Sequence, residues 1–272
     1  LRVTKASLKG LPRSPDRAVD IARRRAGDAG EALAIDGRED IEPRAIRGFD
    51  VRPTDEECCP ADRRVALLNT LGIPFIVHGR SEGFDFDYAF LDIDNEGAFH
   101  EAARLLVQLG HRRLALINGD DRETFAIHRE RGMRRALAVS GLVLGERHIC
   151  SVAMTEENGY RAARRLLEQS EPPTAIACSS LIMSLGVVRA VRDLGLTIPG
   201  DLSLIAHDDV FPWLKPENFP VPLSTTRSSI RLAGARVAER LAARISGLEE
   251  GARGEVWPVD LVVRGSVAGA PA

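Results

Sequence analysis

Two adjacent aspartates, Asp208 and Asp209, follow a short apolar run in the segment SLIAHDDVFP. Paired carboxylates can act as an acid and a base, and with His207 they could bind a metal ion. Adjacent residues of a strand point to opposite faces, however, and no third convergent ligand follows, so the sequence disfavours a metal site. No nucleophile is paired with an evident base, and no HExxH, GxSxG, Walker or GxGxxG motif occurs, so nothing favours an enzyme or a bound cofactor.

Asp208 is better suited to binding a sugar. It lies at the carboxyl end of a predicted parallel strand, where open α/β sheets bind ligands, and a carboxylate there accepts hydrogen bonds from neighbouring hydroxyls. Phe211 and Trp213 lie just beyond, and aromatic faces beside a carboxylate hold a sugar ring. Alternatively, either aspartate caps the next turn and the aromatic residues are core. We expect Asp209 to fix the loop that carries Phe211 and Trp213.

Arg129 opens a run of charged residues, RERGMRR (129–135). Such a run is most often a solvated helix face held by local ion pairs. Arg129 differs because it begins a predicted helix after a strand and the loop GDDRETFAIH, which is again where such sheets bind ligands. The segment DIDNEG (92–97) imitates a calcium loop, but Ala103 stands where the loop needs glutamate, so a polar turn before a helix capped by Asn95 is expected.

Short apolar runs alternate with helical patterns from about residue 65 onward, which predicts an α/β fold with parallel sheets flanked by helices. The first 65 residues are poorly specified, with one helix over 16–26 and a strand over 46–53. Continuous apolar character predicts buried strands, and apolar residues at helical spacing that end near a glycine predict five helices. The expected strands are 73–78, 113–119, 174–180, 202–207 and 256–266, and the expected helices are 95–111, 128–141, 156–169, 184–195 and 229–247.

The composition is that of an ordinary globular protein. The 272 residues are 44% hydrophobic and 28% charged. The net charge of −2 leaves no surplus of basic residues that would indicate a DNA-binding face. No apolar run approaches the roughly 18 residues of a membrane span, and the first residues lack the apolar core of a signal peptide, so we expect a cytoplasmic protein. The four cysteines, Cys58, Cys59, Cys150 and Cys178, form no CxxC pair and are expected to be structural thiols.

Several long segments in a fixed order resemble the effector-binding part of LacI/GalR-type bacterial transcription regulators. The similarity covers roughly residues 65–266, and HGR (78–80) with the segment 206–230 is most similar to repressors of α-glucoside utilisation. The segments that carry it are GIPFIVHGR, DIDNEGAFHEAARLLVQLGHRRLALING, RERGMRRAL, MTEENGYRAARRLLE, PPTAIACSSLIMSLGVVRAVRDLGLTIPGDLSLIAHDD, PLSTTRSSI and PVDLVVRGS.

This resemblance implies a periplasmic-binding-protein-like fold of type I, in which two lobes enclose a sugar or sugar-like effector. The chain should cross between lobes near Asp92 to Asn95, Leu223 to Thr226 and Arg253 to Trp257. The implied division is a poorly specified segment (1–64), a first lobe (65–92 and 224–250), a second lobe (93–223 and 253–266) and a tail (267–272).

The resemblance also implies the effector contacts. Arg129 occupies the arginine position of the family's RxxG element, and Asp208 is the first aspartate of its paired acids. Ser180 stands where asparagine is common in the family, so the effector there is larger, contacted through water, or different in its hydroxyls. We expect alanine at Arg129 or at Asp208 to abolish the effector response and leave the fold intact. Further cleft positions implied by the family are His78, Arg80 and Met154.

The implied function is a sugar-responsive transcription regulator that acts as a homodimer on operator DNA, provided that a DNA-binding head is present. The family's helix-turn-helix and hinge helix are not found whole in the first 64 residues. A sugar solute-binding protein of the same fold is the alternative, although no signal peptide supports it. An enzyme acting on sugars is the weakest reading, because no acid/base pair or nucleophile can be named.

Overall fold

The computed structural model describes residues 62–208, 210–249, 251 and 253–271. The helix expected over 16–26, the strand expected over 46–53 and Asp209 lie outside these residues. The helices are α2 (Arg63–Thr70), α3 (Asn95–Gln108), α4 (Thr124–Val139), α5 (Glu156–Leu167), α6 (Leu181–Asp193) and α7 (Ile230–Ile245). The strands are β1 (Val77–His78), β2 (Phe90–Ile93), β3 (Leu114–Asn118), β4 (Ile149–Ser151), β5 (Ala175–Cys178), β6 (Ser203–Asp208), β7 (Ser224–Arg227), β8 (Gly254–Trp257) and β9 (Asp260–Val262).

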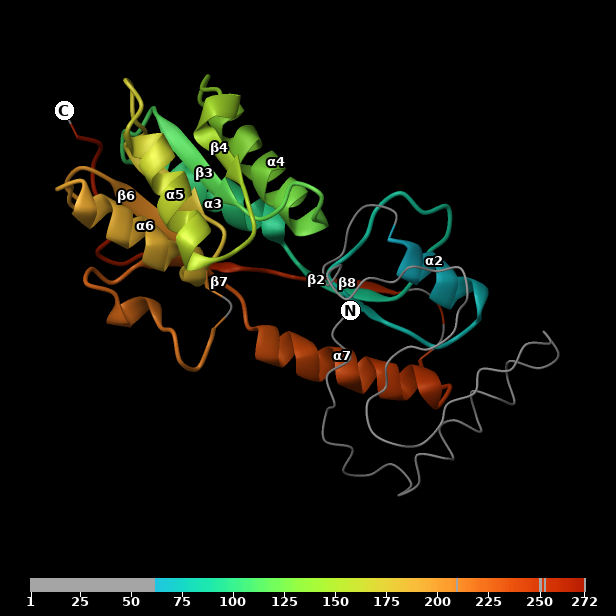
Figure 1. The fold of residues 1–272 in the computed structure, drawn as a ribbon. Helices are drawn as coiled ribbons and strands as arrows, with labels where there is room; N and C mark the ends of the chain where they lie inside the picture. Colours follow the sequence, from blue (N-terminus) through green and yellow to red (C-terminus); the bar gives the residue numbers. More distant parts are fainter. Residues whose placement is uncertain (1–61, 209, 250, 252, 272) are drawn as a thin grey trace.

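The strands form two separate sheets (Figure 1). The smaller sheet has the order β1-β2-β8 and is entirely parallel. The larger sheet has the order β4-β3-β5-β6-β7-β9 and is parallel except for β9, which runs antiparallel to β7 at the edge. The expected α/β class, with parallel sheets flanked by helices, is confirmed.

The six-stranded sheet is buried on both faces, which explains why its central strands are continuously apolar. Side chains alternate along β3, so Leu114 and Leu116 belong to the core under α3 and α4, whereas Ala115 and Ile117 belong to the core under α5 and α6. Burying each large aliphatic side chain contributes about 1.5–3 kcal/mol. These two cores make the larger sheet a rigid platform, which holds the residues at its edges in fixed positions.

Two cysteines lie within this platform. Cys150 and Cys178 are free and buried, and burial raises the pKa of both thiols. A thiol with a raised pKa is a weak nucleophile, as expected of structural cysteines. Cys58 and Cys59 lie outside the described residues.

The three-stranded sheet has a smaller and more aromatic core. Val65 of α2 packs with Phe75 and Val77, and partly buried aromatic residues of the segment 84–90 surround them. Helix α7 lies along this sheet (Figure 1), where the buried Arg240 donates to the carbonyl oxygens of Phe90 at 3.0 Å and of Arg253 at 2.7 Å. Arg240 therefore ties α7 to the strands beneath it.

The chain passes between the two sheets three times, at positions that differ in part from those expected. The first crossing lies between β2 and α3. Residues 224–227 were expected in the first lobe, but β7 pairs with β6 in the larger sheet, so the second crossing follows Arg227. Residues 254–257 were expected in the second lobe, but β8 pairs with β2 in the smaller sheet.

Pro258 explains the third crossing. The run 256–266 was expected to be one strand, but it is divided between β8 and β9, which belong to different sheets. Proline has no N–H to donate and cannot continue a ladder, so the chain leaves the smaller sheet after Trp257. Strand pairing depends on neighbours distant in the sequence, which is why the local pattern did not reveal this division.

Helices α3 and α4 approach each other closely at Gly132, the glycine of the RxxG element. A Cβ atom at this position would overlap the carbonyl oxygen of Glu96 on α3. We expect Gly132→Ala to lower the free energy of unfolding by about 1–3 kcal/mol, because the two helix backbones must move apart. Urea unfolding measures this change. Gly234→Ala in α7 is the matched control, since no atom lies within 4 Å of its added Cβ, and equal stability of the two variants would contradict the prediction.

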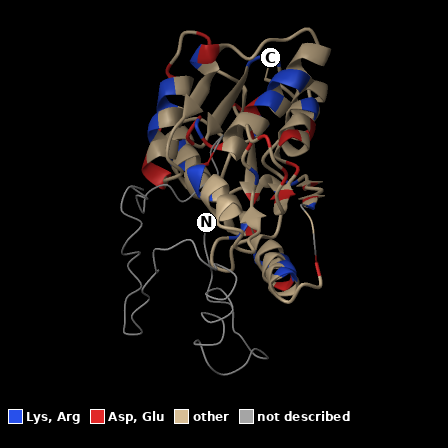
Figure 2. Ribbon diagram, turned by 90° about the vertical axis from the view of Figure 1, so that its right-hand side faces the viewer, with Lys and Arg blue, Asp and Glu red and all other residues tan. Residues whose placement is uncertain are grey.

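Positively and negatively charged residues are interspersed along the surface helices (Figure 2). Many of them form local ion pairs, such as Arg161 with Glu157 at 2.9 Å, one helical turn apart. Within the described part of the chain, no helix is long and apolar enough to cross a membrane.

Candidate ligand-binding site

The carboxyl ends of β3, β5 and β6 lie side by side, because these strands are parallel neighbours in the larger sheet. Asn118 ends β3, Ser180 follows β5 and Asp208 ends β6, and all three side chains are buried. Polar groups therefore gather at one sheet edge, which is where open α/β sheets bind ligands.

Arg129 lies at this edge, in the second turn of α4, and is only 5% exposed. Its Nε donates to Oδ1 of Asn95 at 2.8 Å and its NH1 donates to the carbonyl oxygen of Ser179 at 2.8 Å. The guanidinium carbon lies 5.2 Å from the ring centre of Phe99 and 4.7 Å from that of Phe125. Planar stacking and directed hydrogen bonds hold this cation at the end of β5.

The rest of the charged run behaves differently. Arg131 and Arg135 are about half exposed and pair with Glu96 of α3, and Arg134 pairs with a glutamate one turn earlier. The pair of Arg134 is local, as expected of a solvated helix face, whereas those of Arg131 and Arg135 join α4 to α3. Arg129 is the only buried arginine of this run, in which the apolar Met133 is also buried.

Asp208 is 3% exposed and holds the turn that follows β6. Its Oδ1 accepts a hydrogen bond from the backbone N–H of Val210 at 2.7 Å, and Val210 has a φ of 59°, which is costly for a β-branched residue. Its Oδ2 lies 4.0 Å from Nε of Arg227. The turn-capping role considered as an alternative is therefore real, and it fixes the carboxylate in one orientation.

A cavity of about 580 Å³ opens beside Asp208. Phe211 lines it and stacks on Trp213, with ring centres 5.4 Å apart, although Trp213 is 67% exposed and does not line the cavity itself. The remaining lining includes charged groups of both signs. Its residues are Asp208, Val210, Phe211, Pro212, Leu214, Lys215, Pro216, Glu217, Arg227, Ser229, Ile230 and Arg231.

The other predicted site residues occupy different surroundings. Ser180 is the N-cap of α6, and its hydroxyl oxygen accepts from the N–H of Met183 at 3.2 Å. Met154 packs in part against the core under α5 and α6. His78 is exposed at the end of β1, and Arg80 follows it and reaches toward α4. The structure thus brings Arg80, Arg129 and the end of β5 together, and it leaves Met154 half in the core.

Asn95 was expected to cap α3, but the cap is Asp94, whose Oδ1 accepts from the N–H of Gly97 at 2.8 Å. The Asn95 side chain instead links Arg129 to Oδ1 of Asp92, which lies 3.4 Å from its Nδ2. This role of Asn95 was not predicted from the sequence. The available signal was the segment DIDN, which places three polar side chains where β2 ends and α3 begins.

Asp92 is the second residue that sequence reasoning missed. Burial raises the pKa of this carboxyl, against the opposing effects of a hydrogen bond from the backbone N–H of Ile93 and of the Arg80 charge. Arg80 reaches Oδ2 of Asp92 with its Nε at 2.9 Å. A buried carboxylate paired with an arginine in this way organises the polar side chains around it.

His207, considered above as a metal ligand, uses Nδ1 to contact the hydroxyl of Thr226 at 2.9 Å. Within residues 62–271, apart from positions 209, 250 and 252, no three His, Cys, Asp or Glu side chains are grouped to hold a metal ion.

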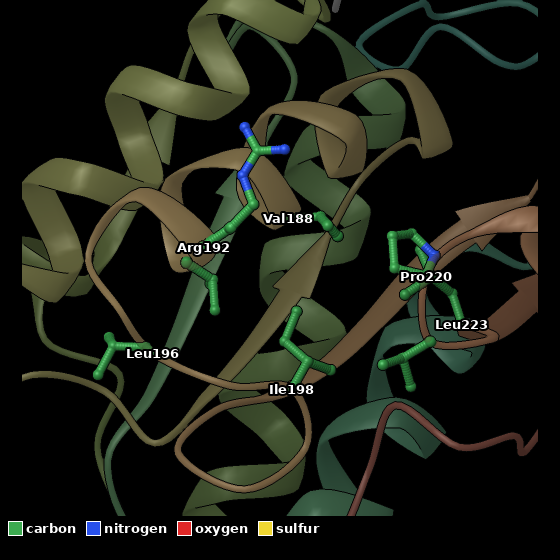
Figure 3. A pocket seen from close by; sticks show the side chains of 8 residues that line it. Val188, Arg192, Leu196, Ile198, Pro220 and Leu223 are labelled. Atoms are coloured by element: carbon green, nitrogen blue, oxygen red, sulfur yellow. The ribbon is translucent and has the colours of Figure 1, made fainter.

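A second pocket, of about 110 Å³, lies between α6 and the segment before β7 (Figure 3). Val188, Ile198 and Leu223 are among its apolar lining residues, and the guanidinium of Arg192 points away from them. This pocket lacks the polar groups that a sugar needs, so the cavity beside Asp208 is the better candidate site.

Comparison with known proteins places the chain in a family. Residues 103–267 match the model of the periplasmic binding protein-like domain. The HTH-type transcriptional regulator AglR of Rhizobium meliloti (strain 1021) is 54% identical over 210 residues, which are 77% of this chain and 59% of the relative. The chain therefore spans less than two thirds of this relative.

Solved structures agree with this match. The crystal structure of a regulatory protein of the LacI family from Chloroflexus aggregans has a TM-score of 0.69 and 32% sequence identity, covering 77% of this chain and 74% of that one. The complex of the transcriptional regulator CelR with cellobiose has a TM-score of 0.70 and 28% identity, covering 76% of this chain and 63% of that one.

Proposed function

Because this chain belongs to the LacI family and carries its periplasmic-binding-protein-like domain, we propose that it is the effector-binding part of a sugar-responsive transcription regulator. One observation supports the proposal above all. Two buried ionic side chains, Asp208 and Arg129, lie at the same sheet edge, and Asp208 lines a cavity of about 580 Å³. That volume suits a small-molecule ligand.

The effector is a sugar, and an α-glucoside is the class that the resemblance of HGR and the segment 206–230 favours. Asp208 accepts hydrogen bonds from ring hydroxyls, Arg129 donates to ring or hydroxyl oxygens, and Phe211 covers an apolar sugar face. The sequence and its family resemblance imply five further effector contacts, none of which lines the cavity beside Asp208: Ser180, His78, Arg80, Met154 and Trp213. The CelR relative, solved as a cellobiose complex, supports a sugar ligand for this fold.

The mechanism follows from the two sheets. Each sheet forms the centre of one lobe, and an effector between the lobes contacts them differently in open and closed arrangements. The resulting shift in lobe arrangement changes how the attached DNA-binding heads of a cytoplasmic homodimer fit a palindromic operator. Coupling of this kind amounts to about 1–3 kcal/mol, or a 5- to 150-fold change in affinity. A solute-binding protein is less well supported, because the matched relatives are named as transcription regulators.

Calorimetric titration of the 272-residue chain tests the proposal. We expect at least one α-glucoside from a panel of maltose, sucrose and trehalose to bind with a dissociation constant in the micromolar to millimolar range, about −8 to −4 kcal/mol. Lactose, a β-galactoside, and glucose 6-phosphate serve as comparison ligands. Tighter binding of either of these would reassign the effector class, and no binding of any sugar or sugar phosphate would refute the proposed function.

A further inference from the structure

His128 joins the two sheet systems at the edge of the proposed site. It lies on α4, next to Arg129, and its side chain is fully buried. Its Nε2 lies 2.7 Å from Oε1 of Glu82, and its Nδ1 lies 3.4 Å from NH2 of Arg80. Arg80 and Glu82 both belong to the segment that follows β1 of the smaller sheet. One imidazole therefore contacts two side chains of the opposite lobe.

The partners of His128 indicate the tautomer of its ring. A guanidinium can only donate, so Nδ1 must accept from Arg80 and carries no proton. The proton of the neutral ring is then on Nε2, which donates to Glu82. The pKa of Glu82 is lowered, chiefly by this hydrogen bond, so the carboxylate is kept in the ionised form that accepts it. The direction of donation runs from Arg80 through His128 to Glu82.

The same arginine begins a second series of hydrogen bonds that returns to α4. Arg80 donates to Asp92, Asp92 contacts the amide of Asn95, and Asn95 accepts from Nε of Arg129. Asp92, Asn95 and Arg129 are each 5% exposed or less. Such a series is stiff, because buried polar groups that lose a partner have no water to replace it.

We propose that His128 is a positioning residue that clasps the segment 78–82 of one lobe to α4 of the other and, through Arg80, Asp92 and Asn95, orients Arg129 toward the effector. This inference rests on the proposed function of the site. The clasp favours the closed arrangement of the lobes, so its loss reduces the fraction of molecules that can bind and weakens the apparent affinity by that fraction.

Two substitutions weaken the His128–Glu82 half of the clasp and leave the Arg80 half in place. His128→Asn keeps an amide near the position of Nδ1 but loses the donor at Nε2, and Glu82→Gln removes only the carboxylate charge at a site that is half exposed. We expect each to weaken binding of the sugar that binds the unaltered chain by about 5- to 20-fold. The double variant should bind the sugar with no lower affinity than the single variant of lower affinity, since the two substitutions disrupt the same interaction.

His100→Asn, at a less buried histidine of α3, is the matched control and should leave the affinity unchanged. Hydrogen exchange of the backbone amides 78–82 should become faster in His128→Asn and Glu82→Gln but not in His100→Asn. Unchanged affinity in Glu82→Gln, or additive losses in the double variant, would overturn the proposal. If the unaltered chain binds no sugar, the proposed function fails, and unchanged exchange in segment 78–82 would then reject the clasp separately.

Discussion

Replacing Arg129 with alanine should abolish sugar binding and also lower the free energy of unfolding by about 3 kcal/mol. The substitution leaves Oδ1 of Asn95 and the carbonyl oxygen of Ser179 buried without their donor, and each such loss costs about 1–3 kcal/mol. It also removes the cation between the rings of Phe99 and Phe125. The sequence alone led us to expect an intact fold, and the burial of Arg129 changes that expectation.

Arg131→Ala is the control for this experiment, because Arg131 lies one half-turn along the same helix, is 49% exposed and pairs with Glu96 at 2.6 Å. A surface pair of this kind contributes about 0–1 kcal/mol. Urea unfolding and sugar titration should therefore be almost unchanged in the control. Equal stability of Arg129→Ala and Arg131→Ala would mean that the buried hydrogen bonds of Arg129 do not stabilise the fold. Sugar binding by Arg129→Ala would mean that Arg129 does not contact the effector.

The sequence predicted the platform of the larger sheet well because its strands and helices carry strong local patterns. Strands β3, β5 and β6 each contain an uninterrupted apolar run, and all five expected helices are present. Helix α4 begins at Thr124, four residues before its expected start. This start was not predicted because the N-cap residue, Glu123, makes no capping hydrogen bond with its side chain. A helix start without a capping residue such as Ser, Thr or Asp leaves little trace in a sequence.

Strand β7 shows why other elements could not be predicted. Its sequence, STTR, is polar, yet Ser224, Thr225 and Thr226 are buried. The hydroxyl of Ser224 contacts the backbone of Arg264, and that of Thr226 contacts His207, so distant residues satisfy these groups. Buried polar strands depend on such partners, and the partners are set by the fold instead of by the local sequence.

Some residues of the candidate site could likewise be predicted from the sequence, and others could not. Asp208 and Arg129 follow strands, so the strand-end rule and the family resemblance both identify them. His128 and Glu82 are 46 residues apart and meet only because the two lobes do. No spacing in the sequence predicts a contact between these two residues, and neither belongs to a motif that suggests ligand binding.

Asp208→Asn should weaken sugar binding by roughly 10- to 100-fold while the fold stays intact. The amide is the same size as the carboxylate, and its oxygen can still accept the hydrogen bond from Val210 at the end of β6. What is lost is the negative charge, and a hydrogen bond to a charged group contributes about 1.5–3 kcal/mol. Alanine is a poorer test, because it also removes the acceptor that holds Val210 at its positive φ. Calorimetry with the sugar that binds the unaltered chain measures the change.

Asp201→Asn provides the matched comparison, because Asp201 is an exposed carboxylate just before the other end of the same strand, where it accepts from Thr197. Its affinity for sugar should equal that of the unaltered chain. Equal affinities in Asp208→Asn and Asp201→Asn would leave Asp208 with its turn-capping role alone. A loss of affinity in Asp208→Asn alone would instead mean that this carboxylate both caps the turn and binds the sugar. The hydrogen bond that Oδ1 accepts from Val210 then also fixes the direction in which Oδ2 meets a sugar hydroxyl.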